Sequence, residues 1–463
     1  MDNAYKKYFE GLKGKKVAVI GIGISNLPLI YMLLSCGADV CARDKKTKEA
    51  LGKTYDELVS RGARVIAGDD YLLDLTEEII FKTPGMRYDV KELAAAREAG
   101  RTVTSEMEVF MELCPARVFA VTGSDGKTTT TTLIYEMLKK EGYTCHLGGN
   151  IGAPLLPKIA EIKKDDMVVL ELSSFQLHTM KKSPDAALIT NLSPNHLDYH
   201  KSMDEYVDAK KNIYLHQRAD ARLVLNRDND ITNDIYSKMK DKRETLGFSK
   251  TLHAEDGAYL DGGDIVMLKN GEKTRVMSKD DIYLPGMHNV ENYLAATAMV
   301  WGYVSPETIL YTARNFKGVA HRIEFVRELH GVRYYNDSIA SSPTRTLAGL
   351  NSFDQKLIVI AGGYDKNLDY TVMGDALIEK VKTLVLTGAT AKKIETAVTE
   401  NKNYRGAPEI IRADSFKNAV IAAAYAAREG DTVILSPASA SFDLFKNFEE
   451  RGNEFKRIVN ELN

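Results

Sequence analysis

The sequence predicts an α/β protein built from three consecutive α/β domains with mainly parallel sheets. Short Val/Ile-rich runs alternate with helical patterns along the whole chain, which is typical of parallel strands joined by crossover helices. At 463 residues the chain is also too long for one compact core, and roughly two to four domains are expected. The runs fall into three series, which predict domains at 1–106, 107–318 and 319–463.

Each series repeats a strand-then-helix order. The first opens with a strand, a glycine turn, a helix and a second strand, which is Rossmann-like, as is the third series; the second opens with a strand, a glycine-rich loop and a helix typical of a P-loop-type domain. A polar hairpin is expected within 257–268, followed by a helix in 289–304. The other expected strands lie within 167–174, 186–193, 221–228, 318–338, 356–367, 381–398 and 431–448.

The composition indicates an ordinary globular protein. It is 44% hydrophobic and 27% charged with a formal net charge of -2, so it offers no electrostatic argument for nucleic acid or an acidic membrane. The four cysteines form no CxxC pair, and the first residues, "MDNAYKKYFEGLKGKK", lack the apolar run of a signal peptide. We expect reduced thiols in a cytoplasmic monomer that spans no membrane.

The loop "TGSDGKTT" carries the clearest chemistry. Gly123 and Gly126 free the backbone to turn its N–H groups towards phosphate oxygens, and the helix that follows presents its positive end to the same place. Lys127 is expected to reach the terminal phosphates and Thr128 to offer its hydroxyl to magnesium. The spacing is two residues shorter than in the usual P-loop, so the generic motif is not matched.

Further polar residues follow the strands of the second series. Glu171 ends an apolar strand, where its carboxylate is expected at the carboxyl edge of the sheet as a second magnesium-side ligand. "TNLSPNHLDYH" places Asn195, His196 and Asp198 after another strand, whereas His200 is expected to be exposed. The helix in "SMDEYVDAKKNIY" carries Lys210 and Lys211, and a pair of helix lysines is ordinarily solvated.

The amino-terminal turn "GIGISN" resembles a dinucleotide fingerprint. Asn26 replaces its third glycine, and Asp44 ends the next strand, where a ribose-binding acid stands in such sites. From this segment alone, a plain Rossmann-like turn and an NAD site both remain open.

Taken together, these stretches resemble the Mur ligase family over essentially the full length of the chain. The stretches that carry the resemblance are "TGSDGKTT", "LGGNIG", "LELSSFQL", "NHLDYH" with "AKKNIY", "GMHNVENYLAA", "HRIEF", "YYNDS", "GGYDKN" and "SPASASFDLFKNFEERGNEF". The short loop spacing is that of the family. Among its branches the chain looks most like the one that adds D-glutamate to UDP-N-acetylmuramoyl-L-alanine.

The resemblance implies a uridine-nucleotide domain, an ATPase domain and a mobile C-terminal domain that brings the amino acid. It implies an acyl-phosphate intermediate, ATP as co-substrate and two Mg²⁺ ions. By position it implies catalytic and metal-side roles for Lys127, Thr128, Glu171, His196, Lys210 (as a carbamate) and Asp337. The ATP set is Gly123, Ser124, Asp125, Gly126, Lys127, Thr128, Thr129, Asn289, Asn292, Arg322 and Asp337; the UDP-substrate set is Ile24, Ser25, Asp44, Thr83, Pro84, Gly85 and Asn150; the D-glutamate set is Lys366, Ser441, Asn447 and Phe448.

Two positions depart from the family pattern. Asp125 replaces the Asn usual in the loop, and Ile339 stands where the family usually has a Lys. "DSIASSPTRTLAGL" predicts a loop that ends at Ser342 as the helix N-cap, with Pro343 first in the helix and Arg345 in its first turn. Arg345 is therefore expected to point back over the loop and to replace the missing cation.

Three other functions are compatible with parts of the sequence. A sibling ligase would add L-alanine or a diamino acid, although "SASFDLFKNFEERG" favours D-glutamate. A nucleotide-sensing relative without ligase activity would explain Ile339. A nicotinamide oxidoreductase would use "GIGISN" alone, and nothing else in the chain supports hydride transfer.

Overall fold

The computed structural model describes residues 4–23, 25–194, 200–366 and 368–463, and within them the chain is an α/β protein with three mainly parallel sheets. Two compact units can be separated by their internal contacts. The first comprises Met1–Asp281 and Val290–Ala313, and the second Ile282–Asn289 and Arg314–Asn463. Two of the sheets belong to the first unit and one to the second.

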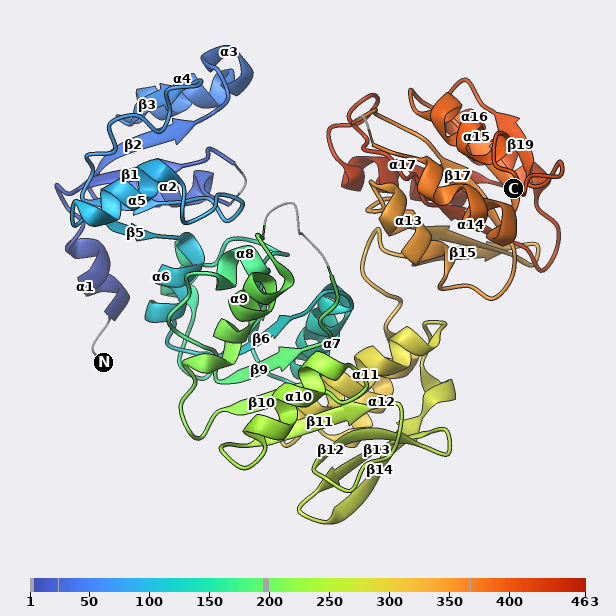
Figure 1. The fold of residues 1–463 in the computed structure, drawn as a ribbon, viewed down its shortest axis with the longest axis horizontal. Helices are drawn as coiled ribbons and strands as arrows, with labels where there is room; N and C mark the ends of the chain where they lie inside the picture. The colour runs from blue at the N-terminus through green and yellow to red at the C-terminus, as the bar shows by residue number, and fades with distance from the viewer. Residues whose placement is uncertain (1–3, 24, 195–199, 367) are drawn as a thin grey trace. The chain divides into compact units, whose positions relative to one another are not determined.

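The first sheet has the strand order β3-β2-β1-β4-β5, and all of its neighbours are parallel (Figure 1). Its central strand has four consecutive buried residues, as expected for a parallel strand covered on both faces. The strands are β1 (Lys16–Ile20), β2 (Asp39–Asp44), β3 (Arg64–Ala67), β4 (Ile79–Phe81) and β5 (Thr102–Thr104); the helices are α1 (Ala4–Glu10), α2 (Leu27–Ser35), α3 (Lys48–Leu51), α4 (Lys53–Ser60), α5 (Lys91–Glu98) and α6 (Glu106–Leu113).

The second sheet has nine strands in the order β14-β13-β12-β11-β10-β9-β6-β8-β7. Its first six strands in sequence are parallel, and β12 to β14 form an antiparallel extension at one end, which confirms the hairpin predicted within 257–268 (Figure 1). The strands are β6 (Arg117–Thr122), β7 (Cys145–Gly149), β8 (Met167–Glu171), β9 (Ala186–Ile189), β10 (Arg222–Asn226), β11 (Thr245–Ser249), β12 (Gly257–Asp261), β13 (Asp264–Lys269) and β14 (Glu272–Ser278).

Helices connect these strands and cover the sheet. The run of five threonines lies at the start of α7, as predicted. The helix begins at Lys127, directly before the threonines, and continues to Glu141. The helices are α7 (Lys127–Glu141), η1 (Leu156–Glu161), α8 (Ser174–Leu177), α9 (Met203–Leu215), α10 (Asp230–Met239), η2 (Lys279–Asp281), α11 (Met287–Val300) and α12 (Pro306–Asn315).

The third sheet has the order β15-β16-β20-β17-β18-β19, with only the β15–β16 pair antiparallel. The strands are β15 (Glu324–Leu329), β16 (Val332–Asn336), β17 (Leu357–Ala361), β18 (Val381–Leu386), β19 (Glu409–Arg412) and β20 (Thr432–Leu435); the helices are α13 (Pro343–Leu350), η3 (Thr371–Met373), α14 (Gly374–Lys380), α15 (Ala391–Thr399), α16 (Phe416–Ala426) and α17 (Phe448–Glu461). The predicted start of α13 is confirmed, with Ser342 as N-cap and a proline in the first turn.

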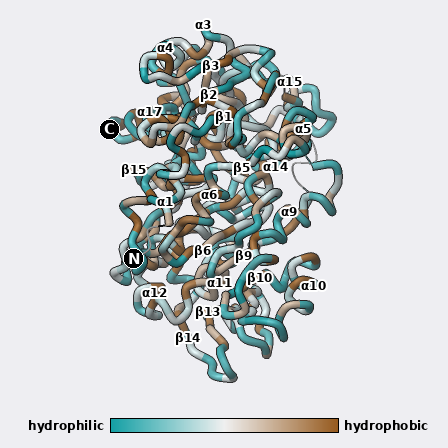
Figure 2. Tube along the Cα trace, turned by 90° about the vertical axis from the view of Figure 1, so that its left-hand side faces the viewer, coloured by the Kyte–Doolittle hydropathy of each residue, from teal (hydrophilic) through white to brown (hydrophobic). Residues whose placement is uncertain are grey.

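Hydrophobic and hydrophilic segments alternate along the chain (Figure 2). Among the helices that the structure describes, none combines the length and apolar character that crossing a bilayer requires. The four cysteines are free thiols, of which only Cys41 is fully buried.

Candidate active site

The loop between β6 and α7 has a backbone that requires glycine at two positions. Gly123 and Gly126 adopt φ angles of +149° and +76°. A Cβ on Gly123 would lie 1.8 Å from Oγ1 of Thr190, and one on Gly126 would lie 2.6 Å from Oδ1 of Asn292. The loop therefore packs directly against the end of β9 and against α11, and no larger residue fits at either position.

Lys127 lies over this loop at the start of α7. Its Nζ donates to the carbonyls of Gly123 (3.0 Å) and Ser124 (2.8 Å). Thr128 and Thr129 follow in the first turn, where the helix presents unpaired backbone N–H groups and a positive dipole end. This arrangement places a cation and N–H donors at one point, which suits a phosphate chain.

Ser124 and Asp125 fix the outer part of the loop. Ser124 is buried, its Oγ donates to the carbonyl of Ser193 (3.0 Å), and it lies 2.9 Å from the hydroxyl of Tyr206. Asp125 is exposed, and its backbone N–H donates to Oδ1 of Asn191 (2.9 Å). The acid that departs from the family pattern thus faces solvent.

Glu171 ends β8, as predicted, and is almost completely buried. Nδ2 of Asn150 donates to its Oε1 at 2.7 Å, whereas its Oε2 has no hydrogen-bond partner among the described residues. Leaving a buried carboxylate oxygen without a donor is costly. The donor set therefore fits a hard cation such as Mg²⁺, which prefers oxygen ligands.

Lys210 on α9 is 2% exposed, so the expectation for an ordinary helix lysine does not apply to it. Its Nζ donates to Oγ1 of Thr122 (3.0 Å) and to the carbonyl of Gly123 (2.8 Å). Burial, and next the charge of Lys127, hold the pKa of the Lys210 ammonium well below its ordinary value. Its amine therefore loses a proton more readily than a solvated lysine does, whereas Lys211 pairs with Asp208 at 2.9 Å.

His196 lies outside the described residues, together with Asn195 and Asp198, so its predicted place beside Glu171 stays a prediction. The expectation that His200 is exposed is wrong: it is 1% exposed, and its Nε2 lies 2.9 Å from Oγ of Ser174. His200 is instead part of a group with His178 and Glu205, whose ligand atoms lie within 4.8 Å of one another.

Arg87 already pairs with the carboxylate of that group. Its Nη2 donates to Oε1 of Glu205 at 2.8 Å, which lowers the pKa of the Glu205 carboxyl to about 2. Because Arg87 follows β4 and Glu205 belongs to α9, this ion pair joins the first sheet's connections to those of the second.

Of the predicted UDP-substrate residues, Ser25, Asp44 and Thr83–Gly85 lie at or after the carboxyl ends of strands of the first sheet, whereas Asn150 follows β7 of the second sheet. Oδ2 of Asp44 accepts from the backbone N–H of Ile22 (2.6 Å), so this carboxylate holds the glycine turn. A Cβ on Gly21 would lie 3.0 Å from Cβ of Thr83, which brings the turn against Thr83–Gly85. Ser25 is exposed next to them, and Ile24 lies outside the described residues.

In the second unit, Asp337 follows β16 and is buried. Oδ2 accepts from Oγ of Ser436 (3.0 Å), and Oδ1 from the backbone N–H of Ile323 (3.3 Å). Burial raises the pKa of this carboxyl to about 7, against the opposing effects of Ser436, Arg322 and Arg345. Nη1 of Arg345 donates to the carbonyl of Ile339 at 3.3 Å, so the predicted return of Arg345 over the loop is confirmed.

The four predicted D-glutamate residues come from two loops and one helix start. Lys366 is exposed and its Nζ lies 5.2 Å from the ring centroid of Phe442, next to Ser441. Asn447 is the N-cap of α17, and Phe448 is the first residue of that helix. Sequence reasoning missed Arg451, one turn further on, which is 2% exposed and donates to carbonyls of Ser338, Ser439 and Ala440.

Arg451 thereby joins the loop after β16 to the loop after β20. A single arginine in an amphipathic helix gives no local signal of such a role. Only the tertiary contacts identify it, and the same is true of Thr190 beside the phosphate loop.

Asn289 and Asn292 lie three residues apart on α11. Oδ1 of Asn292 accepts from Oγ1 of Thr130 at 3.1 Å, so Asn292 contacts the first turns of α7. Nδ2 of Asn289 donates to the carbonyl of Pro285 at 2.7 Å.

Comparison with known proteins identifies the class of protein to which this fold and site belong. The Mur ligase middle domain matches residues 121–300, and the Mur ligase glutamate ligase domain matches residues 321–439. The chain belongs to the Mur ligase family.

Within the family, three similar relatives share one name. The UDP-N-acetylmuramoylalanine–D-glutamate ligase of Acetivibrio thermocellus is 56% identical to this chain, and that of Ruminiclostridium cellulolyticum is 51% identical, each over 100% of both chains. The corresponding enzyme of Clostridium novyi is 52% identical, again over 100% of both.

Solved structures share the fold at low identity. A UDP-N-acetylmuramate-alanine ligase from Thermotoga maritima has a TM-score of 0.58 at 19% identity, covering 96% of this chain and 99% of that one. A MurF ligase from the same organism, in complex with ADP, has a TM-score of 0.56 at 18% identity, covering 98% and 97%. These two similarities support the fold alone.

The raised pKa of Asp337 predicts a pH dependence of stability. Between its ordinary value of 3.8 and about 7, the folded chain binds a proton at Asp337 that the unfolded chain has released, so this group's contribution to stability falls as pH rises through that window. Asp337→Asn keeps the shape without the charge. The free energy of unfolding of the variant minus that of the wild type should therefore be larger, meaning that the variant is relatively more stable, at about pH 8 than at about pH 5.

Urea denaturation of the ligand-free chain at both pH values measures this difference. Asp354→Asn, at an exposed aspartate of the same unit, is the matched control and should show no comparable change. An Asp337→Asn variant whose stability follows pH as the wild type does would contradict the assignment.

Proposed function

We propose that this chain uses ATP to join D-glutamate to UDP-N-acetylmuramoyl-L-alanine, in the cytoplasmic synthesis of peptidoglycan precursors. The observation that carries the proposal is the 56% identity, over the full length of both chains, to a relative named for that reaction. The phosphate loop, with Lys127 over it, supports the use of a nucleoside triphosphate.

The reaction proceeds in two steps. The carboxylate oxygen of the UDP-linked acceptor attacks the γ-phosphorus of ATP, the bond to the β-phosphate oxygen breaks, and an acyl phosphate and ADP form. The amine of D-glutamate then attacks the acyl carbon, giving a tetrahedral intermediate that expels phosphate and loses a proton to leave the amide. A carboxylate is a poor acyl donor, so phosphate supplies the leaving group.

Residues of the first unit would hold the phosphates and Mg²⁺. Lys127 and the N–H groups of the loop would bind the phosphate chain, and Thr128, Glu171, His196 and Lys210 would hold the metal. When bound, Mg²⁺ neutralises charge that develops on the transferred phosphoryl group. The buried Oε2 of Glu171, which has no hydrogen-bond partner among the described residues, supports this assignment.

We propose that Lys210 acts as a carbamate. Its amine, whose ammonium is destabilised by burial, would attack carbon dioxide, form an N–C bond and lose a proton. The anionic oxygens then serve the metal side of the site, where an ammonium would repel a cation.

The remaining roles follow the family pattern. In the first domain, Ile24, Ser25, Asp44 and Thr83–Gly85 would bind the uracil and the diphosphate, and Asn150 would hold the phosphate or sugar side of the substrate. Asn289, Asn292, Arg322 and Asp337 would serve ATP, and Lys366, Ser441, Asn447 and Phe448 would bind D-glutamate. The identity of the relatives favours D-glutamate over the amino acids that sibling ligases add.

Product formation and isotope transfer test the proposed reaction. With ATP, Mg²⁺, the UDP-linked acceptor and D-glutamate, mass spectrometry should detect the amide, and oxygen-18 placed in the acceptor carboxylate should appear in the released phosphate. Replacing D-glutamate with L-alanine or a diamino acid should give little product. Amide formed without isotope transfer would contradict the acyl phosphate, and no amide at all would support a nucleotide-sensing protein.

The carbamate predicts a particular form of rescue. Lys210→Ala should lose most of its turnover, and acetate should restore part of it because a short carboxylate replaces the lost anion. Steady-state rates with and without acetate measure this. Lys211→Ala, at the neighbouring half-buried lysine, is the control and should keep near-normal turnover. Rescue of Lys210→Ala by methylamine instead of acetate would rule out an anionic role.

Arg345 is proposed to replace the cation that Ile339 lacks. Loss of one preorganised donor aimed at developing charge costs about 2.7 to 4 kcal/mol in the transition state, so Arg345→Ala should lower kcat by roughly a hundredfold with little change in binding of the UDP substrate. Arg333→Ala, at an exposed arginine of the same unit, is the control and should not lower kcat. Ile339→Lys should restore activity to Arg345→Ala, and near-normal kcat in the single variant would refute the replacement.

A further inference from the structure

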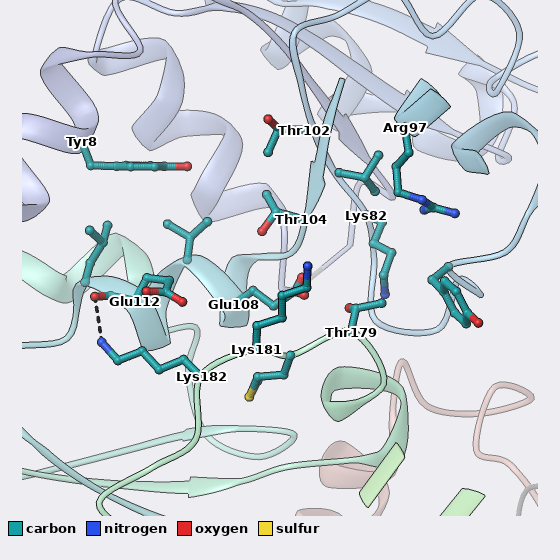
Figure 3. Close-up of a pocket in the computed structure, with 15 residues that line it drawn as sticks. Tyr8, Lys82, Arg97, Thr102, Thr104, Glu108, Glu112, Thr179, Lys181 and Lys182 are labelled. Carbon is teal, nitrogen blue, oxygen red and sulfur yellow. Dashed lines mark hydrogen bonds between the residues drawn. The ribbon is translucent and has the colours of Figure 1, made fainter. Parts of the chain in front are cut away.

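A cavity in the first unit is lined by charged groups that the proposed ligase reaction does not use. Its volume is about 350 Å³, and its walls come from α1, the segment after β4, α5, β5, α6 and the segment after α8. Figure 3 shows Tyr8 on one side, Arg97 on the other, and Glu108 and Lys181 between them. Of the described residues proposed for the UDP substrate, none lines this cavity.

The basic side chains of the cavity outnumber the acidic ones. The cavity has an excess of two positive charges, since its lining contains four basic residues, Lys82, Arg97, Lys181 and Lys182, and two acidic residues, Glu108 and Glu112. Among the residues that the structure describes, Lys82, Arg97, Lys181 and Glu108 form no ion pair. These charges therefore line the cavity without direct ion-pair contact, although Glu108 lies close enough to stabilise the Lys82 ammonium electrostatically.

Lys82 is the most constrained of these groups. It is 3% exposed, and its Nζ makes one long hydrogen bond to the residues that the structure describes, to the carbonyl of Met86 at 3.4 Å, although an ammonium has three donors. Glu108, which has the opposite charge, has a buried Oε2 with no hydrogen-bond partner in the part of the chain that the structure describes. One cavity thus contains a buried cation and a buried acceptor that both lack hydrogen-bond partners among the described residues. This costs free energy unless a ligand supplies those partners.

The rest of the wall is suited to an organic body. Val103, Val109, Leu113 and Met180 supply apolar surface, and Tyr88 lies under the guanidinium of Arg97 at 5.7 Å. Inorganic anions alone would leave this surface uncovered.

We propose that the cavity binds a small organic acid, whose carboxylate or phosphate is held by Lys82 and Lys181 and whose hydroxyl donates to Glu108. Its apolar body packs against Val103, Val109, Leu113 and Met180. The site is separate from the ATP and UDP sites, and its occupation does not depend on the ligase reaction.

Ligand-observed NMR titration of the full chain tests this, with 4-hydroxybenzoate and 4-hydroxyphenyl phosphate as the two acids and 4-hydroxybenzamide as the neutral probe. Binding of either acid, about tenfold or more tighter than the amide, is expected and shows which anion the site prefers. Failure of both acids to bind, or equal binding of the amide, would overturn the proposal.

Variants locate the binding. Lys82→Met should weaken the acid about tenfold or more, and Lys181→Met, at an exposed position where folding is not at risk, should weaken it also. Lys91→Met, at an exposed lysine on α5, is the matched control and should leave the dissociation constant unchanged. Unchanged binding in both variants, or displacement of the acid by saturating UDP or ADP, would place the probe elsewhere and overturn the proposal.

Discussion

The candidate phosphate site depends on the close approach of Gly123 to the end of β9. Parallel pairing places Thr122 opposite Ile189, so the loops that follow β6 and β9 leave the sheet at the same level. Thr190 then occupies the space that a side chain at Gly123 would need, and the backbone N–H of Ser124 donates to the carbonyl of Asn191 at 2.9 Å. Because the spacing between paired strands is fixed, these contacts constrain the loop, and the loop in turn positions Lys127 and the first turn of α7.

In each unit, burial alters the acid–base properties of a residue proposed for the site. In the first unit, Lys210 and Glu171 are buried near the loop that follows β6. In the second unit, Asp337 is buried at the start of the loop that follows β16. Burial is the largest cause of the pKa shift of both Lys210 and Asp337. It lowers the pKa of the Lys210 ammonium and raises the pKa of the Asp337 carboxyl. These groups follow parallel strands or pack against their ends, where α/β sheets bind ligands.

The fold was predictable to a large extent because its signals are local. Apolar runs of strand length, the glycine loop before α7 and the proline at the start of α13 each specify an element from a few neighbouring residues. Lys210 and His200 show the limit: one was assigned a role by family resemblance and the other was expected to be exposed, yet both are nearly completely buried. Burial depends on what packs from elsewhere in the chain, which no window of sequence contains.

The sequence by itself therefore determined the α/β class, the phosphate loop and the family, since these depend on periodicity, glycine spacing and motif order. Only the tertiary structure decided that Arg451 joins the loops after β16 and β20, that Glu171 keeps an oxygen with no hydrogen-bond partner among the described residues, and that Lys82 lines a charged cavity. The physical reason is that hydrogen-bond satisfaction and desolvation are properties of a three-dimensional neighbourhood, whereas strand and helix propensities are properties of the chain.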